Sequence, residues 1–166
     1  SLAYPDRRFG VFVALLMETG ARKSELLERR WREVDLDRGE ILAPVTKNGT
    51  PRILFFRAET AALMRRIYPR RDENALLFEG RVPNTPICYR KAWRIATREA
   101  GLSTLRMHDL RHAAAASLLR AGVTLPVAAQ VLGHDPAVLA RRYGHLETNA
   151  LRLAQEQAWK HATKVG

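Results

Sequence analysis

The spacing of apolar residues changes from a helical period to a strand period in one part of this chain and then changes back. Near the start, apolar residues recur at helical spacing, at Phe9, Phe12, Val13 and Leu16. Residues 32–56 contain short extended runs instead, separated by Asp37-Arg38-Gly39 and Asn48-Gly49, and Asn-Gly is the strongest short-range signal for a β-hairpin. Everything afterwards is helical in spacing. The pattern predicts a mainly α fold with one small three-stranded antiparallel sheet over about 32–56.

Capping and turn residues predict where the helices begin and end. The first helix is expected over 5–18, with Gly20 closing it in a left-handed conformation, and the second over 24–30. Thr85-Pro86 is typical of an N-cap followed by proline at the first helical position, so a helix from there to Ala100 is expected. The remaining helices are expected over 58–68, 108–121, 125–132, 136–143 and 149–162.

Charge restricts the kind of partner. Lysine and arginine number 28 against 17 aspartate and glutamate, which gives a formal net charge of +11. Of those 28 cations, 23 are arginine, whose planar guanidinium suits phosphate. A polyanionic partner is therefore expected, most simply nucleic acid, with an anionic membrane surface as the alternative. No apolar run approaches the roughly 20 residues of a membrane span, which argues against a membrane protein.

Length and cysteine content bound the architecture and the compartment. A chain of 166 residues without repeats or Gly/Ser linkers suits a single domain over 1–166. The single Cys88 excludes a disulfide framework and a cysteine-rich zinc site, and it fits a reducing compartment such as the cytoplasm. Because the chain begins with Ser1 rather than methionine, we expect it to be a piece of a longer protein.

Two short strings place cations where an anion could bind. In His108-Asp-Leu-Arg111, the imidazole and the guanidinium are three residues apart at the start of an expected helix, so they share a face beside unpaired backbone N–H groups. In Gly20-Ala-Arg22-Lys-Ser-Glu25, an arginine lies at a tight junction between two helices, where it favours an external anion or an ion pair with Glu25. Each string alone is also compatible with a purely structural role.

Two further positions complete the set of candidates. Lys47 lies immediately before the Asn-Gly turn, where a hairpin tip carries its ammonium either into a cleft or into solvent. Leu132-Gly-His134 is followed nine residues later by Tyr143, which has arginines just before it. Neighbouring cations lower the pKa of a phenol, although Tyr143 could equally be a packing residue.

Taken in order, these residues resemble the catalytic domain of the tyrosine recombinase, or phage integrase, family. The strings that carry the resemblance are TGARKSELL (19–27), HDLRH (108–112), LGH (132–134) and RRYGHL (141–146). The resemblance covers the chain from the first expected helix to the last. It implies a site-specific recombinase that cleaves and rejoins DNA strands without ATP, metal or other cofactor. A type IB topoisomerase shares this chemistry, but the motif strings are more similar to those of an integrase.

The resemblance assigns the proton transfers and the covalent step. Tyr143 would attack the scissile phosphate and form a 3′-phosphotyrosyl enzyme, leaving a free 5′-hydroxyl. His108 would accept the proton of the phenol. Lys47 would protonate the 5′-oxygen leaving group, a role for which Arg52 and Lys23 are competing candidates.

The resemblance also assigns the groups that bind the phosphate. Arg22 and Arg111 would clamp its non-bridging oxygens, and His134 would donate a further hydrogen bond. Glu25 would orient Arg22. Residues 135–142 depart from the family pattern, which often has small hydroxylated residues there, so local contacts are expected to differ.

Double-stranded DNA is the partner that this resemblance implies. The helix expected to begin at Thr85-Pro86 carries a cationic stripe on one face, which would contact DNA phosphates or remain a solvated surface, formed by Arg90, Lys91, Arg94 and Arg98. Four protomers would assemble on two DNA sites. The core-binding domain that precedes the catalytic domain in full-length members would lie upstream of this chain.

Two other classes of function compete with this interpretation. His108 and His112 are spaced i, i+4, as the zinc ligands of a metalloprotease are, although Asp109 is shorter than the glutamate such an enzyme uses. Separately, the helices expected over 125–132 and 136–143 are joined by a tight turn, like a helix-turn-helix in a DNA-binding module without catalysis.

Overall fold

The computed structural model describes residues 6–44, 51–144, 152 and 155. The chain divides into two compact units, 1–114 and 115–166. The described part of the chain is mostly helical and contains one three-stranded antiparallel sheet, which confirms the predicted fold class. The prediction of a single domain over 1–166 stays a prediction.

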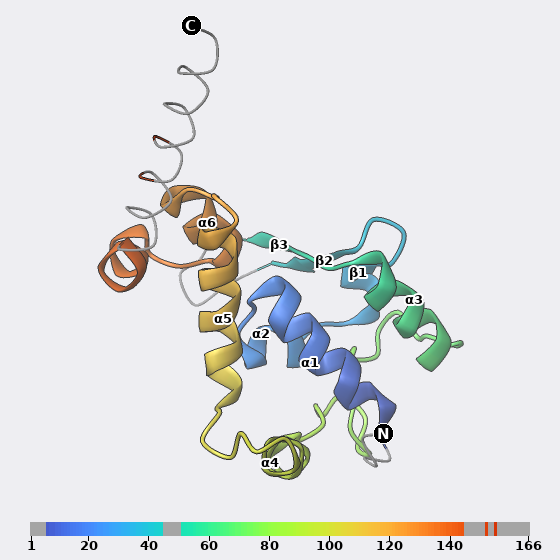
Figure 1. Cartoon of the computed structure of the whole chain (residues 1–166). Helices are drawn as coiled ribbons and strands as arrows, with labels where there is room; N and C mark the ends of the chain where they lie inside the picture. Colours follow the sequence, from blue (N-terminus) through green and yellow to red (C-terminus); the bar gives the residue numbers. More distant parts are fainter. Residues whose placement is uncertain (1–5, 45–50, 145–151, 153–154, 156–166) are drawn as a thin grey trace, which may run out of the picture. The chain divides into compact units, whose positions relative to one another are not determined.

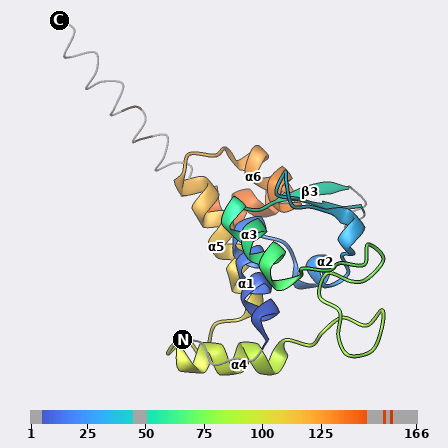
Figure 2. The ribbon, with the colours of Figure 1, turned by 90° about the vertical axis from the view of Figure 1, so that its right-hand side faces the viewer.

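The first unit contains the sheet, most of the described helices and the start of a helix that continues into the second unit (Figure 1). In chain order its elements are α1 (Arg7–Thr19), α2 (Lys23–Leu27), the 3₁₀ helix η1 (Trp31–Glu33), β1 (Val34–Asp35), β2 (Glu40–Ala43), β3 (Arg52–Phe55), α3 (Ala58–Ile67), α4 (Arg90–Glu99) and α5 (Met107–Arg120). Both views place α1 between the sheet and α4 (Figures 1 and 2).

The sheet buries one face and exposes the other, as the alternation of its side chains dictates. Ile41 of β2 pairs with Leu54 of β3, and both side chains are buried. The next pair, Leu42 and Ile53, points the opposite way and is about half exposed. Arg52 opens β3 opposite Ala43 and shares the buried face of the sheet.

The core of the first unit forms around α1. Its apolar stripe packs with the buried face of the sheet, with α3 and with an aromatic cluster in which Tyr89 contacts Phe9, Phe12 and Phe78 at ring-centroid distances of 4.8–6.1 Å. The residues on α1 that are almost completely buried are Val11, Phe12, Leu15 and Leu16. This core fixes the C-terminal end of α1, where the turn formed by residues 19–22 begins.

The second unit contains the end of α5, then α6 (Leu125–Leu132) and a helix over residues 136–144. The bounds of α6 are those predicted, and Gly133 closes it with a positive φ of 61°. Its buried side chains are small or aliphatic apart from Tyr143: Ala115, Leu119, Leu125, Ala128, Ala129, Leu132 and Leu139. None of the described helices is long and apolar enough to cross a bilayer.

The helix predicted to start at Thr85-Pro86 begins later, at Arg90, so that N-terminal prediction is wrong. Pro86 forms an isolated β-bridge with Glu79, and the Ile87 N–H donates to the Phe78 carbonyl oxygen at 2.9 Å. These tertiary hydrogen bonds hold residues 85–88 in an extended path that leads Tyr89 into the aromatic cluster. The local N-cap signal is overridden by that burial.

The other helix bounds differ by a few residues. Helix α1 begins at Arg7 because the Asp6 carboxylate accepts a hydrogen bond from the Arg8 N–H at 3.0 Å and caps it. Helix α2 ends at Leu27 rather than at Arg30, because Arg30 pairs with Leu76 in a β-bridge. The Asn48-Gly49 turn lies outside the described residues, as does most of the helix expected over 149–162, of which residues 152 and 155 are helical.

Gly39 is the turn residue whose substitution we expect to be most damaging to the sheet. Its φ is +67°, and an added Cβ would lie 2.5 Å from the Phe56 carbonyl oxygen. Gly39→Ala should lower the free energy of unfolding by about 1–3 kcal/mol, measured by urea denaturation. Gly10→Ala is the matched control. It lies within α1 with open space around it, so it should raise stability by about 0.4–1 kcal/mol. A destabilised control with an unaffected Gly39→Ala would contradict this account.

Candidate functional site

The turn between α1 and α2 places Arg22 by backbone hydrogen bonds. Gly20 closes α1 at φ 59°, and its N–H donates to the Leu16 carbonyl oxygen at 3.1 Å. The Thr19 hydroxyl donates to the Leu15 carbonyl oxygen at 2.6 Å and accepts from the Ala21 N–H at 3.0 Å. Three residues, 20–22, therefore connect the two helices, and Arg22 becomes the N-cap of α2.

Glu25 is the centre of an ion cluster drawn from three separate elements. Its Oε2 accepts the Arg22 N–H at 2.6 Å and lies 2.7 Å from Nη2 of Arg52. Its Oε1 lies 3.4 Å from Nη1 of Arg22. Arg111 of α5 reaches the same carboxylate more loosely, at 3.8 Å from Oε2, and donates to the Gly20 carbonyl oxygen at 2.6 Å.

Most of this cluster is buried, and its exposed member is a cation. The side chains of Arg111, Arg52 and Glu25 are 1%, 7% and 9% exposed, whereas that of Arg22 is 31% exposed. Three guanidiniums share this one carboxylate. Because the exposed member is a cation, the cluster presents its charge to the surface through Arg22, which suits an anion with several oxygens.

The pKa of the Glu25 carboxyl reflects these neighbours. Burial raises this pKa, but the hydrogen bond from the Arg22 N–H and the charge and hydrogen bond of Arg52 lower it by more. The nearby charge of Arg111 lowers it further. The pKa therefore lies below its usual value, and Glu25 is ionised at neutral pH.

His108 and Arg111 lie on one face of α5, one turn apart, as their spacing predicts. His108 is exposed, and its ring meets that of His112 edge-on at a centroid distance of 4.7 Å. Arg106 and Asp109 form an ion pair at 2.8 Å beside them. Across the described residues, no three side chains of the metal-binding types come together, so the described part of the chain gives the zinc interpretation no support.

His134 and Tyr143 belong to the second unit. The His134 N–H donates to the Ala129 carbonyl oxygen at 2.9 Å, which closes the C-terminus of α6 after Gly133. Asp135 then starts the next helix, because its carboxylate accepts the Ala137 N–H at 2.7 Å. Tyr143 lies one turn after Leu139, and both side chains are buried.

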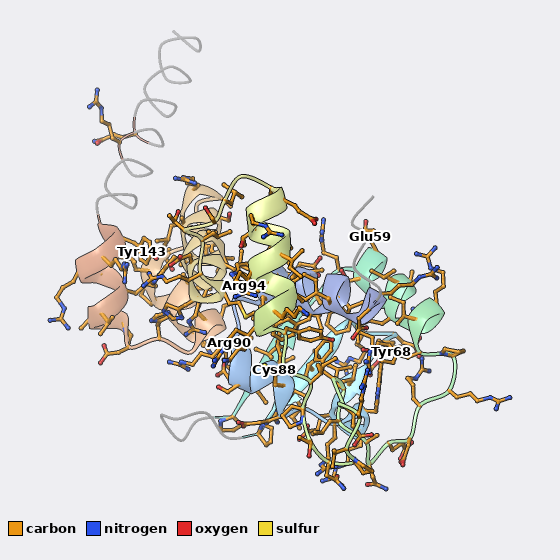
Figure 3. All side chains as sticks on the ribbon, turned by 90° about the horizontal axis from the view of Figure 1, so that it is seen from below. Glu59, Tyr68, Cys88, Arg90, Arg94 and Tyr143 are labelled. Carbon is orange, nitrogen blue, oxygen red and sulfur yellow. The ribbon has the colours of Figure 1, made fainter. Side chains whose placement is uncertain are left out.

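Exposed cations line α4 in the first unit. Figure 3 shows Arg90 and Arg94 along this helix, with Cys88 just before it. The four cations of this stripe form no ion pair with a described residue: Arg90, Lys91, Arg94 and Arg98. A pocket of about 470 Å³ lies at the start of α4. Its lining combines apolar residues such as Trp93 with the cationic residues Lys23, Arg90 and Arg106.

Comparison with known proteins identifies the family. The sequence profile of the phage integrase family matches residues 2–150. The chain belongs to that family. This confirms the resemblance derived from the four motif strings.

Individual members of the phage integrase family are similar along most of this chain. It is 33% identical over 142 residues to the tyrosine recombinase XerA of Saccharolobus solfataricus, covering 86% of this chain and 47% of that protein. The crystal structure of an XerA recombinase has a TM-score of 0.74 at 27% identity, covering 95% of this chain and 59% of that one. The Tn1549 transposon integrase, solved in complex with circular intermediate DNA, has a TM-score of 0.72 at 20% identity, covering 92% and 60%. The chain spans about half the length of the curated relatives it matches.

The structure brings together some of the predicted site residues. Arg22 and Arg111 meet at Glu25, and His108 shares the helix of Arg111. His134 and Tyr143 lie in the other unit, and Lys47 lies outside the described residues. The predicted roles of all six residues stay predictions.

The cluster also contains a residue that the sequence assigned differently. Arg52 was a competing candidate for the role of Lys47, but its side chain is buried against Glu25. The signal for this was present in the sequence, because alternation along β3 puts Arg52 on the same face as Leu54. An arginine on the buried face of a strand requires a buried acid as partner.

Replacing Glu25 tests whether it is the counter-charge of the cluster. Glu25→Gln should lower the free energy of unfolding at pH 7 by about 3–5 kcal/mol, because buried guanidiniums lose their partner. The folded-state pKa of Glu25 is below its usual value of 4.5, so its contribution is complete above about pH 4.5 and is lost as pH falls through the folded-state pKa. The difference between wild type and variant, measured by urea denaturation from pH 7 to pH 3, should therefore shrink on acidification.

Asp37→Asn is the control for this series. Asp37 pairs with Arg65 on the surface, where its side chain is 94% exposed, so its loss should cost less than about 1 kcal/mol at any pH. A Glu25→Gln variant as stable as wild type at pH 7 would contradict the assignment, as would a difference that grows on acidification.

Proposed function

We propose that this chain is the catalytic domain of a site-specific DNA recombinase, which cleaves and rejoins DNA strands through a 3′-phosphotyrosyl intermediate at Tyr143. The observation that carries the proposal is the ion cluster, in which three guanidiniums converge on one carboxylate in a chain of the phage integrase family. The similar proteins are named as recombinases or integrases, and the Tn1549 integrase was solved bound to DNA. The net charge of +11 fits a nucleic-acid partner.

The guanidiniums supply the electrostatic part of the proposed reaction. Arg22 and Arg111 bind the non-bridging oxygens of the scissile phosphate, whose negative charge concentrates in the transition state. The Arg111 guanidinium donates to the Gly20 carbonyl oxygen and that of Arg22 faces Glu25 Oε1 at 3.4 Å, so both are oriented before substrate arrives. Such preorganised donors lower the barrier without reorganisation during the reaction. His134 donates a further hydrogen bond to the same phosphate.

The covalent step passes from the phenol to the DNA 3′ end. The Tyr143 oxygen attacks phosphorus, the bond to the 5′-oxygen breaks, and the 3′-phosphate stays on the tyrosine. His108 accepts the phenol proton, and Lys47 gives a proton to the leaving 5′-oxygen. Rejoining is the reverse, with a 5′-hydroxyl attacking the phosphotyrosine. The phosphodiester energy is kept in the phosphotyrosine, so the exchange needs no ATP.

The other two described tyrosines belong to the aromatic packing of the first unit. Burial raises the pKa of Tyr68, and that phenol lies against Trp31 at a ring-centroid distance of 4.7 Å. Tyr89 is 3% exposed inside the aromatic cluster. Tyr4 lies outside the described residues.

Duplex DNA crosses the cationic surface of α4 in this proposal. The stripe of Arg90, Lys91, Arg94 and Arg98 has no intramolecular counter-charge among the described residues, so its cations are available to phosphates. The longer protein would act in the cytoplasm as a tetramer on two DNA sites.

A non-catalytic DNA-binding module is the second candidate function. It is favoured by α6 and the helix over 136–144, which are joined by only three residues and capped on both sides of the joint. The two candidates differ in whether a covalent protein–DNA complex forms.

Trapping on a nicked suicide duplex of the protein's own attachment site tests the nucleophile. The longer protein should give a covalent band, and mass spectrometry should place the adduct on Tyr143. Tyr143→Phe should abolish the band, whereas Tyr68→Phe should keep it. Arg22→Ala should slow its formation by about 10²–10³-fold, because one transition-state donor is lost. Undiminished trapping by Tyr143→Phe overturns the assignment, and no trapping by wild type favours the binding module.

The salt dependence of DNA binding tests the α4 surface. Each phosphate contact contributes about −0.9 to the slope of log affinity against log salt, so replacing Arg90, Arg94 and Arg98 by alanine should reduce its magnitude by up to about 2.7. The control removes the same charge elsewhere in the first unit, from the ion-paired surface residues Arg38, Arg57 and Arg65. Equal slopes for wild type and the α4 variant would remove this part of the proposal.

A further inference from the structure

We propose that Arg52 is a positioning residue of the site: its guanidinium fixes the Glu25 carboxylate in the one orientation that directs Arg22 at an anion. The inference rests on the proposed function only where the anion is taken to be a DNA phosphate. Its geometric basis is the ion cluster itself.

The two carboxylate oxygens of Glu25 have different partners. Oε2 takes the two shortest contacts, 2.6 Å from the Arg22 backbone nitrogen and 2.7 Å from Nη2 of Arg52. Oε1 is left to face Nη1 of Arg22 at 3.4 Å. A carboxylate rotates easily about its terminal torsion, which has broad, roughly two-fold preferences. The contacts of Oε2 remove that freedom, and Oε1 then stays directed at the Arg22 guanidinium.

Arg52 makes the shortest side-chain contact with Glu25. Its distance of 2.7 Å is that of a charge-assisted hydrogen bond, whereas the guanidiniums of Arg22 and Arg111 lie at 3.4 Å and 3.8 Å. Without Arg52, Oε2 would be open to the guanidinium of Arg22, which already faces Oε1. By satisfying Oε2, Arg52 keeps the guanidiniums of Arg22 and Arg111 at these longer distances from the carboxylate, and the side chain of Arg22 stays 31% exposed.

Arg52 cannot replace Lys47 as a proton donor to the leaving group. A guanidinium stays protonated in proteins, and this one is 7% exposed and bound to Glu25. Its place is also costly, because the buried face of β3 otherwise carries apolar side chains such as Leu54. A positioning role explains why a charge is kept there and why Arg52 acts through Glu25 rather than on the phosphate.

A double-mutant cycle on sulfate binding tests this inference without DNA. Sulfate that binds the folded protein raises the thermal midpoint by mass action, and sodium chloride of equal ionic strength controls for screening. Arg52→Met should weaken sulfate binding about tenfold, because the Glu25 carboxylate then competes for Arg22. In a Glu25→Gln background the same change should cost less than about twofold, since residues that act through one another are not additive.

Arg29→Met is the matched control for a buried, ion-paired arginine. Arg29 pairs with Glu33 at 3.2 Å and meets Glu25 only at its backbone carbonyl oxygen, so sulfate affinity should not change. If Arg52→Met does not fold, Arg52→Lys replaces it in the cycle. Lysine keeps the positive charge but lacks the planar guanidinium. Arg52→Lys should therefore lower sulfate affinity about threefold in the wild-type background and leave it unchanged in the Glu25→Gln background.

Equal losses in both backgrounds would overturn the inference, as would wild-type sulfate affinity in Arg52→Met. A sulfate effect that is absent from wild type, or unchanged in Arg22→Ala, would also overturn it. These outcomes are separate from those of DNA trapping. A coupled sulfate cycle without any covalent complex would retain the positioning role of Arg52 and reject the recombinase, and the reverse pattern would do the opposite.

Discussion

A single buried carboxylate determines what the first unit can present to its surroundings. Arg111 is almost fully buried, and Arg52 occupies the core face of a strand, so neither position is tolerable without a nearby negative charge. Glu25 supplies that charge to both and also caps α2 through the Arg22 N–H. Three elements that are distant in sequence are therefore held together by one ionised group, and the member of the cluster that reaches the surface is the cation Arg22.

The cluster depends on a backbone turn as much as on charge. Gly20 has a positive φ, and its carbonyl oxygen accepts a hydrogen bond from Arg111 at 2.6 Å. A turn that ended α1 differently would move both that acceptor and Arg22. The core around α1 fixes where the turn lies, because Leu15 and Leu16 are buried immediately before it. Hydrophobic packing thus sets the positions, and the ion pairs set the directions in which the guanidiniums point.

Local sequence signals predicted most of the fold and only part of the site. The sheet, the bounds of α6 and the Gly20 cap depend on periodicity and turn chemistry, which act over a few residues. The start of α4 was missed because Tyr89 is drawn into a cluster with Phe9 and Phe78, a tertiary contact that no local pattern records. The same limit applies to the site: an ion pair between Arg22 and Glu25 was foreseeable from their spacing, but the convergence of Arg52 and Arg111 on that carboxylate required the folded structure.

The chemistry of arginine divides the proposed reaction between two sets of residues. Guanidiniums keep their charge at every physiological pH, so phosphate binding by Arg22 and Arg111 would not vary with pH. For the same reason they cannot carry protons, and both proton transfers must fall to imidazole or ammonium groups. Of the candidates, His108 lies one turn from Arg111 on the same helix, α5. The helix therefore fixes the distance between the proposed proton acceptor and a proposed phosphate-binding group. The phenol of Tyr143 is buried, so in this mechanism it must turn outward before it can attack. In the proposed reaction that step would separate DNA binding from cleavage, because Arg22 and Arg111 belong to the first unit and Tyr143 to the second.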